Sequence, residues 1–538
     1  MNDARDGPGL RDARRARVRR AYEAGWYSAR TLRDEVMAPR ERDAELVFTS
    51  PGRPSRTTVG ATLARSTTMA RTMRRLGVRT GDVVAVQLPN WEESIVAYQA
   101  CFLIGAVVLP IVHIYGVAEI GFILRQSGAR VLVVPDVWRG TDYTARIGAL
   151  GDIETLEQVV VVGDHAPAGA LLWHDLEAAP GDDDLPRPDV TADDVCLLVY
   201  TSGTTAAPKG VQHTHNSLLA ELRANEGLLG AGGRKAALQA FPAGHIAGVL
   251  GLLRPIVNGA TTVLMDTWDP HEAAALIEEH AITFTSGTPF HLTTLLDAAE
   301  AHGRVLTSLY GYMSGAANVP PALVERSQEA GFATYRCYGS SEHPTVSSGR
   351  PEDPIAKRAH TDGRVLPGNE VRIVDDDGSD LPAGAEGEIV TRGPELFCGY
   401  RDTRLDAGAF LVGGWYRTGD IGRLDGEGYL AITDRKKDII IRGGENISSK
   451  EVEDVLVAHP SVADAAAVAV PDERYGERVC AFVTLRSGAA LSLDDVRAHF
   501  RSAGVARQKT PERLEVVDDL PRTPAGKVKK FELRQRFR

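Results

Sequence analysis

Short, continuous apolar runs alternate with longer amphipathic stretches along the N-terminal part of the chain. In the stretch 57–80, Leu63, Met69 and Met73 recur near helical spacing, which predicts a helix. A second, mostly apolar helix is predicted at 91–104. The short runs between such helices are typical of parallel strands covered on both faces, so an α/β fold is expected. These runs lie at 83–88, 131–134, 159–162, 195–199 and 263–265.

The pattern changes between residues 364 and 430, where short strands alternate with turns rich in Gly and Asp. A smaller β-rich subdomain is predicted there. The polar, basic segment 434–438 then predicts a domain boundary. We expect an N-terminal domain at 1–434, made of layered α/β subdomains plus the β-rich one, and a small α+β C-terminal domain at 435–538.

The C-terminal part predicts a compact unit of about a hundred residues, enough for an independent domain. Ser448 and Glu451 form a capping-box pattern that begins a helix ending near residue 459. Strands at 465–470 and 479–485 and a helix at 491–502 are expected to follow.

Composition narrows the class of protein. The chain has 538 residues, of which 43% are hydrophobic and 25% charged, as in ordinary globular proteins of more than one domain. Its net charge of -11 argues against a general nucleic-acid binder, which needs a basic surface. The five cysteines are scattered without a C-x-x-C pattern, which indicates neither a disulfide framework nor a zinc site and favours the reducing cytoplasm.

The N-terminal segment is rich in arginine between residues 11 and 20. Asp3, Asp6 and Asp12 are interspersed and no apolar signal-peptide core follows, so a solvated helix is predicted rather than a targeting segment. No apolar run in the chain approaches the ~20 residues of a membrane span.

The segment 200–211, Tyr-Thr-Ser-Gly-Thr-Thr-Ala-Ala-Pro-Lys-Gly-Val, follows a predicted buried strand. It offers the hydroxyls of Ser202, Thr204 and Thr205, close backbone approach at Gly203 and the positive charge of Lys209. Such groups cradle polyphosphates. A Walker loop is excluded, since Pro208 and Gly210 stand where that motif requires Gly and Ser/Thr.

Four further segments join this loop in order: 338–342 (Tyr-Gly-Ser-Ser-Glu), 416–420 (Tyr-Arg-Thr-Gly-Asp), 434–446 (Asp-Arg-Lys-Lys-Asp-Ile-Ile-Ile-Arg-Gly-Gly-Glu-Asn) and 521–527 (Pro-Arg-Thr-Pro-Ala-Gly-Lys). In this order and spacing, the set resembles the signature of the adenylate-forming superfamily, which includes acyl-CoA synthetases, adenylation domains of peptide synthetases and luciferase. The resemblance covers nearly the whole chain. The segment 442–447 is most similar to fatty-acid and alicyclic or aromatic acid–CoA ligases.

The resemblance implies ATP-dependent activation of a carboxylic acid to an acyl-adenylate, followed by transfer to the thiol of coenzyme A. Cations and donors around the α-phosphate stabilise the charge that concentrates there in the transition state. Glu342 and Thr204 are the implied ligands of Mg²⁺, and Lys209 the implied catalytic cation on the outer phosphates. The remaining implied nucleotide contacts of the first two motifs are Thr201, Ser202, Gly203, Thr205, Gly339, Ser340 and Ser341.

The rest of the nucleotide site is implied in the same way. Asp420 and Arg435 correspond to the ribose-binding pair. Tyr338 and the segment Gly315, Ala316, Ala317 correspond to the two sides of the adenine slot.

Lys527 is the implied catalytic cation of the first half-reaction. Because the thiol must take its place in the second half-reaction, the resemblance implies that a mobile C-terminal domain rotates about Lys437. Gly443 and Gly444 would then let the pantetheine arm pass.

His245 corresponds to a gate between the nucleotide and the acyl pocket. The pocket wall is expected from 245–250, 287–291 and 314–317, where Gly and Ala accompany Val249, Leu250 and Phe290. An apolar acyl or aryl group is therefore favoured, and the lack of an acidic residue there disfavours an α-amino acid.

Two positions depart from the family pattern. Ala206 stands where many relatives have Gly, and Ser341 where Thr is usual. Neither change removes a ligand for the nucleotide, and neither bears on the acceptor.

Several alternatives stay open. The acyl group can pass instead to a carrier-protein thiol or an amine, or the adenylate can serve nitrite activation in a diazotising ligase. A non-catalytic homologue and a luciferase-like oxidase are weaker alternatives. The expected partner is a small carboxylic acid, with no nucleic acid and no membrane span, in a monomer or homodimer.

Overall fold

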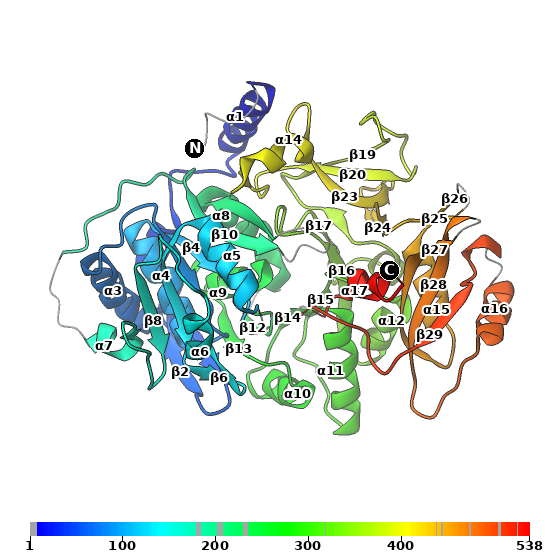
Figure 1. The fold of residues 1–538 in the computed structure, drawn as a ribbon, viewed down its shortest axis with the longest axis horizontal. Coiled ribbons are helices and arrows are strands. Elements are labelled where there is room, and N and C mark those ends of the chain that lie inside the picture. The colour runs from blue at the N-terminus through cyan, green and yellow to red at the C-terminus, as the bar shows by residue number, and fades with distance from the viewer. Residues whose placement is uncertain are drawn as a thin grey trace.

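The computed structural model describes residues 8–113, 115–178, 184–201, 208–229, 235–317, 319–436, 438–442, 445–472, 475–503, 507–523 and 526–537. Two large sheets lie side by side, and two smaller sheets extend toward the C-terminus (Figure 1). The predicted α/β class, with a large N-terminal and a small C-terminal domain, is confirmed.

The first large sheet has eight strands in the order β21-β11-β10-β4-β3-β5-β8-β9. Its centre is parallel, and the predicted runs at 83–88, 131–134, 159–162 and 195–199 form β3, β5, β8 and β10. At one edge β11 and β21 run antiparallel. The elements of this part are β3 (Val83–Val86), β4 (Val107–Pro110), β5 (Ala129–Pro135), β8 (Gln158–Val162), β9 (Leu171–Leu172), β10 (Val195–Thr201), β11 (Lys209–Thr214), β21 (Gly399–Tyr400), α3 (Val59–Arg75), α4 (Glu92–Ile104), α5 (Val117–Ser127), α6 (Tyr143–Gly148), α7 (Trp173–Ala178) and α8 (His215–Ala224), with the small hairpin β6 (Val137–Trp138) and β7 (Thr141–Asp142).

The second large sheet has nine strands in the order β18-β17-β16-β15-β14-β12-β13-β1-β2. Its strands from β16 to β1 are parallel, and the predicted strand at 263–265 forms part of β13. The elements here are β1 (Glu45–Phe48), β2 (Ser55–Thr58), β12 (Ala236–Gln239), β13 (Thr261–Leu264), β14 (Phe284–Gly287), β15 (Gly311–Ser314), β16 (Ala333–Tyr338), β17 (Ser347–Ser348), β18 (Arg364–Val365), α2 (Leu32–Met37), α9 (Ile246–Asn258), α10 (Pro270–Glu279), α11 (Pro289–Ala301), α12 (Pro321–Glu329), α13 (Ile355–His360) and the 3₁₀ helix η1 (Glu226–Leu229).

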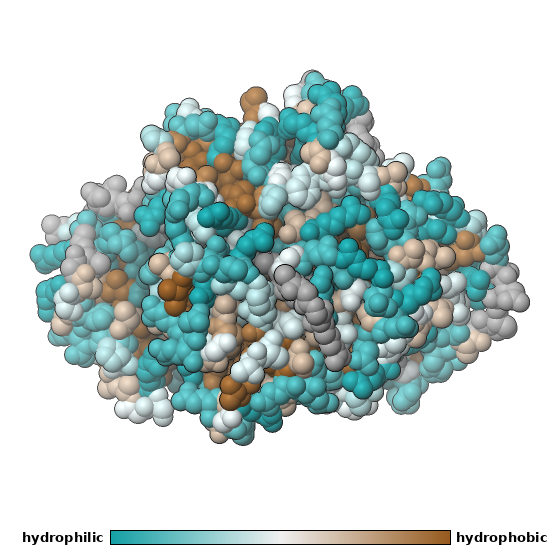
Figure 2. All heavy atoms as spheres, turned by 180° about the vertical axis from the view of Figure 1, so that it is seen from behind, coloured by the Kyte–Doolittle hydropathy of each residue, from teal (hydrophilic) through white to brown (hydrophobic). Residues whose placement is uncertain are grey.

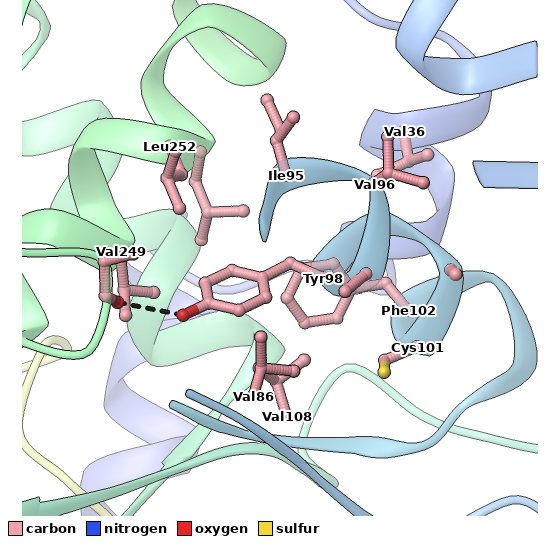
Figure 3. Close-up of a cluster of buried hydrophobic side chains, with 14 of the residues drawn as sticks. Val36, Val86, Ile95, Val96, Tyr98, Cys101, Phe102, Val108, Val249 and Leu252 are labelled. Atoms are coloured by element: carbon pink, nitrogen blue, oxygen red, sulfur yellow. Dashed lines mark hydrogen bonds between the residues drawn. The ribbon is translucent and has the colours of Figure 1, made fainter. Parts of the chain in front are cut away.

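Helix α4 lies in the main core between the two sheets. From Ser94 to Ile104 every residue is buried, as expected for a helix that is apolar on all sides. Tyr98 points toward Val249 and Leu252 of α9 (Figure 3), and its hydroxyl donates a 2.9 Å hydrogen bond to the carbonyl of Ala243. This bond fixes the loop before His245 to the core.

The third sheet is the predicted β-rich subdomain, in the order β19-β20-β23-β22 with β24 paired to β23. Strand β23 is hydrogen-bonded to β20 on one side and to β24 on the other. The residues of the candidate site on β23 are therefore held by an inner strand of this sheet. The elements are β19 (Glu370–Val374), β20 (Gly387–Arg392), β22 (Phe410–Leu411), β23 (Trp415–Leu424), β24 (Leu430–Arg435), α14 (Asp406–Ala409) and η2 (Thr403–Leu405).

The C-terminal sheet has apolar clusters of its own on both faces. Ser448 caps α15 by accepting a 3.1 Å hydrogen bond from the Glu451 amide. The Glu451 carboxylate instead pairs with Lys509 at 2.6 Å, so only half of the expected capping box is seen among the described residues. The elements are β25 (Ile440–Arg442), β26 (Glu445–Ile447), β27 (Val462–Asp472), β28 (Gly476–Leu485), β29 (Arg513–Val516), α15 (Ser449–Val457), α16 (Leu493–Ser502), α17 (Lys530–Gln535) and η3 (Arg507–Lys509). The boundary between 434 and 435 stays a prediction.

Helix α1 (Pro8–Glu23) corrects the expectation of a solvated helix. Arg17 is only 7% exposed and donates to the Phe397 carbonyl at 3.0 Å, and Arg14 pairs with Asp406 at 2.8 Å. The density of arginines in the sequence does not reveal that one face of the helix is docked.

Viewed from behind, the surface is dominated by hydrophilic side chains with smaller apolar areas between them (Figure 2). Among the described residues, no helix combines the length and apolar character needed to span a bilayer.

Replacing Tyr98 by Phe tests the bond that joins α4 to the loop before His245. The change leaves the buried Ala243 carbonyl unpaired, so we expect the free energy of unfolding in urea to fall by about 1–3 kcal/mol. Tyr22→Phe, at a position that is 40% exposed, is the control and should change it by less than about 0.5 kcal/mol. Equal effects of both changes would contradict this role of Tyr98.

Candidate active site

The phosphate loop connects β10 to β11. Thr201 and Lys209 are opposite each other in the antiparallel ladder, so the two ends of the loop meet at one point of the sheet. Ser202, Gly203, Thr204 and Thr205 lie outside the described residues, and their phosphate contacts stay predictions.

Lys209 and Glu342 come together around one tyrosine that sequence reasoning missed. The Lys209 ammonium stands 5.3 Å from the centre of the Tyr400 ring, and the Tyr400 hydroxyl donates a 2.8 Å hydrogen bond to Glu342 Oε1. Burial, and next the charge of Glu342, raise the pKa of Tyr400, so that it remains a phenol donor. Nothing in the sequence around Tyr400 distinguishes it from a core residue.

A tight turn holds Glu342 at the end of β16. The Ser340 amide donates to the His343 carbonyl at 2.9 Å, and the His343 amide donates to Ser340 Oγ at 3.2 Å. A Cβ at Gly339 would lie 1.8 Å from the Pro344 carbonyl oxygen, so only glycine fits there. The Ser341 carbonyl contacts the buried ring of His213 at 2.7 Å. The predicted residues 339–341 therefore shape the backbone that presents Glu342.

Asp420 and Arg435 are directly opposite each other on β23 and β24. Their side chains pair at 2.8 Å, and the Tyr338 hydroxyl donates to the second oxygen of Asp420 at 2.7 Å. The pKa of Arg435 is raised, chiefly by the charge of Asp420, so its guanidinium stays charged. Three residues predicted around the nucleoside thus form one cluster, in which Tyr338 and Asp420 are buried and Arg435 is partly exposed.

The segment 315–317 follows β15 beside the end of β16. A Cβ at Gly315 would lie 2.6 Å from the Cys337 sulfur, and Ala316 adopts a left-handed φ of 65°. Such a conformation costs an L-residue roughly 1–2 kcal/mol and is typical of functional sites. The flat backbone expected for one side of the adenine slot is therefore next to the strand that carries Tyr338.

Lys527 lies in a turn of the C-terminal domain that touches the large domain. The Thr523 amide donates to the Lys527 carbonyl at 2.7 Å, and the Lys527 amide donates to Thr523 Oγ1 at 3.1 Å. At Gly526, where φ is 79°, a Cβ would lie 2.9 Å from Thr288 Oγ1 at the start of α11. Lys437, Gly443 and Gly444 lie outside the described residues.

Lys527 and His245 are brought together. Burial, and next the positive charge of Lys527, lower the pKa of His245 to about 4, so the imidazole is neutral near pH 7. His245 Nδ1 accepts a 3.3 Å hydrogen bond from the Ala247 amide and caps α9, and its ring stacks on Phe241 at 6.0 Å.

The wall near His245 is more aromatic than expected. His291 packs edge-on against Trp268 at 4.8 Å and Phe241 at 6.1 Å, and its Nδ1 accepts from the Thr288 amide at 3.1 Å. Phe290, which the sequence predicts for this wall, is 48% exposed. The expectation that Val249 and Leu250 form part of this wall is corrected, because both are buried in the main core, to which α4 also belongs.

Two buried glutamates lie behind the 338–342 turn. Glu221 accepts from Thr345 Oγ1 at 2.6 Å, and Glu395 accepts from Asn369 at 3.2 Å. Burial, and next the negative charge of Glu221, raise the pKa of Glu395 well above its ordinary value. The protonated, neutral form of Glu395 is therefore favoured beside Glu221.

Residues 34–401 match the family of AMP-binding enzymes, and residues 451–527 match the C-terminal domain of AMP-binding enzymes. The chain belongs to this family, and the predicted membership of the adenylate-forming superfamily is confirmed. The prediction of an AMP-forming acid–CoA ligase is confirmed at the level of enzyme type.

Two relatives and one solved structure illustrate the similarity. The chain is 39% identical over 474 residues to the medium-chain fatty-acid–CoA ligase of Escherichia coli, covering 87% of this chain and 83% of that protein. It is 34% identical to the 2-hydroxy-7-methoxy-5-methyl-1-naphthoate–CoA ligase of Streptomyces carzinostaticus, covering 95% and 94%. The structure of an amide bond synthetase from Marinactinospora thermotolerans superposes with a TM-score of 0.82 at 29% identity, covering 94% of this chain and 99% of that one.

Tyr338→Phe tests the cluster around Asp420. Losing the hydroxyl removes one bond to a buried carboxylate, so we expect the Kd for AMP, measured by calorimetry, to rise about five- to tenfold. The control is Tyr335→Phe on the same strand, where the buried hydroxyl has no hydrogen-bond partner among the described residues. If both variants bind AMP as tightly as the parent chain, Tyr338 does not position Asp420 for the nucleotide.

Glu395→Gln tests the raised pKa of Glu395. A carboxyl with a raised folded-state pKa contributes stability below its unfolded pKa, and this contribution is lost as pH rises through the folded value. The stability of the parent chain should therefore fall relative to Glu395→Gln as pH rises above the ordinary glutamate range, by at most about 1.4 kcal/mol per pH unit.

The measurement for this pair is the urea midpoint as a function of pH. Glu386→Gln, at an exposed site, is the matched control and should stay parallel to the parent chain. Parallel curves for Glu395→Gln as well would show that the pKa of Glu395 is not raised in the folded chain.

Proposed function

We propose that this enzyme activates a carboxylic acid with ATP and transfers the acyl group to the thiol of coenzyme A. In the first step a carboxylate oxygen attacks the α-phosphorus, and the bond to the pyrophosphate oxygen breaks. In the second step the sulfur attacks the acyl carbonyl, AMP leaves with the bonding electron pair, and the thiol proton is released. The observation that carries the proposal is that Gly526, next to Lys527, reaches Thr288 of the large domain, where the charge of Lys527 acts on His245 beside the aromatic wall.

The residues fit a nucleotide that brings its own Mg²⁺. Magnesium prefers oxygen ligands and is commonly held by one or two carboxylates together with substrate phosphates. Glu342 supplies a carboxylate oriented by Tyr400, and Lys209 supplies a neighbouring positive charge. The ion, when bound, would neutralise charge on the phosphates, while Lys209 and Thr204 are proposed to orient them.

Asp420 is proposed to accept hydrogen bonds from the ribose hydroxyls, with Arg435 and Tyr338 fixing the orientation of its carboxylate. The backbone at 315–317 is proposed to lie against the adenine. Both roles need a rigid pocket, and the buried contacts around Asp420 support that rigidity.

Lys527 is proposed to bridge the acid and the α-phosphate in the first step. Because His245 is neutral, it adds no second positive charge beside Lys527, and the Lys527 ammonium is proposed to act on the negative charge that develops at the phosphate. The turn must then leave, and we propose a rotation of the C-terminal domain about Lys437 that brings Gly443 and Gly444 to the site.

For the substrate we propose an apolar acid, with aromatic acids favoured. Phe241, Trp268, Phe290 and His291 gather near His245, where aryl rings can stack edge to face. The names of two relatives, a fatty-acid and a naphthoate ligase, are compatible with both kinds of acid.

An amine acceptor is the second candidate, supported by the similarity to an amide bond synthetase. Transfer to a carrier protein and nitrite activation stay predictions without a specific observation. All five cysteines are free thiols, which supports the proposal of a cytoplasmic enzyme.

The test is exchange of labelled pyrophosphate into ATP across a panel of aliphatic, alicyclic and aromatic acids, repeated with coenzyme A or an amine to identify the acceptor. Lys527→Ala should lower acid-dependent exchange by about 10²–10³-fold, because the transition-state charge loses a fixed cation. Lys529→Ala, which removes an ammonium paired with Glu532, is the control and should keep near-parental exchange.

A second assay separates the two steps. Given a synthetic acyl-adenylate and coenzyme A, Lys527→Ala should form thioester at close to the parental rate, since the lysine must leave for that step. Absence of exchange with every acid, or equal loss in both variants, would contradict the proposal.

A further inference from the structure

A cavity of about 610 Å³ lies between α1 and the strands β3, β4 and β10 of the eight-stranded sheet. Its lining includes neither the Lys527 turn nor the Asp420 cluster. Val83, Val107 and Leu198, from β3, β4 and β10, give it apolar lining, and arginines of α1 give it a charged one. Its volume falls within the range of small-molecule sites. Helix α1, which the sequence predicts to be solvated, thus closes a pocket.

Arg17 is the unusual group in this cavity. It is only 7% exposed, and its guanidinium donates to the Phe397 carbonyl. Among the described residues, its Nε has no hydrogen-bond partner and no carboxylate pairs with it. Burial lowers its pKa, which reflects the cost of keeping the charge there. Fully buried arginines are normally paired, so an anion in the cavity would supply the missing partner.

Three of the four aspartates that line the cavity have partners of their own. Asp406 accepts from Arg14 and from the Tyr400 amide, Asp193 accepts from Asn216 and Tyr22, and Asp194 accepts from Thr191. They therefore do not neutralise Arg17, and the six arginines of the lining outnumber its four aspartates.

We propose that this cavity binds an amphipathic anion, a carboxylate or phosphate group on an apolar body. The head lies against Arg17, and the body lies on Val83, Val107 and Leu198. Charge-assisted bonds to the head and burial of the body would each contribute to affinity.

The cavity shares a wall with the candidate active site. Tyr400 lines it, and the hydroxyl of the same residue donates to Glu342. The Tyr400 amide donates to Asp406, which also holds Arg14 of α1. Tyr400 alone would therefore separate an occupant from Glu342, the carboxylate proposed to hold Mg²⁺.

Cys398 gives a readout specific to this cavity, because it lines the cavity while the similarly half-buried Cys337 does not. The experiment alkylates the full chain with iodoacetamide in mildly alkaline buffer and follows both cysteines by peptide mass spectrometry. Decanoate and decyl phosphate are the probes, and they distinguish a carboxylate from a phosphate head. Acetate, inorganic phosphate and decanol supply the head or the body alone.

We expect at least one of the two amphiphiles to slow alkylation of Cys398 several-fold while Cys337 is unchanged, with much weaker protection by the separate head and body. Arg17→Gln should raise the concentration needed for protection about tenfold or more, since it removes a charge-assisted bond. Arg20 is exposed on the same helix and lies outside the cavity lining. In Arg20→Gln, the amphiphile should therefore protect Cys398 at the same concentration as in the parent chain.

If Arg17→Gln does not fold, the double change Arg11→Gln, Arg15→Gln at the cavity rim serves in its place and should weaken protection in the same direction. Unchanged alkylation of Cys398 with both amphiphiles, or equal protection in the arginine variants and the parent chain, would overturn the proposal. The assay contains neither ATP nor a turnover step, so its outcome is independent of the proposed ligase activity.

Discussion

The buried carboxylate of Asp420 is the contact on which the arrangement of the candidate site depends. It lies on β23 of the β-rich sheet, accepts from Tyr338 at the end of the nine-stranded sheet, and pairs with Arg435 at the end of β24. Arg435 is also close to the start of the C-terminal domain. One anion therefore ties together two sheets and the segment from which the small domain departs. Breaking one partner of such a buried pair is costly, because the other charge is left without compensation.

Much of the fold could be predicted from the sequence. The continuous valine-rich runs at 131–134 and 159–162 form neighbouring parallel strands, because only strands buried on both faces need to be apolar at every position. The docking of α1 could not be predicted. Its arginines look solvated in sequence, and the burial of Arg17 depends on Phe397, which lies 380 residues away.

In the candidate site, too, some residues could be predicted from the sequence and others could not. Short motifs contain Glu342, Asp420, Arg435 and Lys527, whose residue types match the chemistry of phosphate, ribose and carboxylate. Tyr400 and His291 have no such signal, since their roles arise from contacts between distant segments. The position of Val249 after His245 predicts a place in the pocket wall, but Val249 lies on the apolar face of α9 that packs in the core. Spacing along the chain identifies chemistry better than it identifies which face of a helix lines a cavity.

The contact between Gly526 and Thr288 has a consequence for the lifetime of the intermediate. An acyl-adenylate is a mixed anhydride that water can hydrolyse, so its survival depends on how well the site is closed while it waits for the acceptor. With Gly526 seated against Thr288 at the start of α11, closure is provided by the same domain that is proposed to rotate away later. The dwell time of the small domain would then set the balance between transfer and wasteful hydrolysis, and a slow acceptor would cost the enzyme ATP rather than only time.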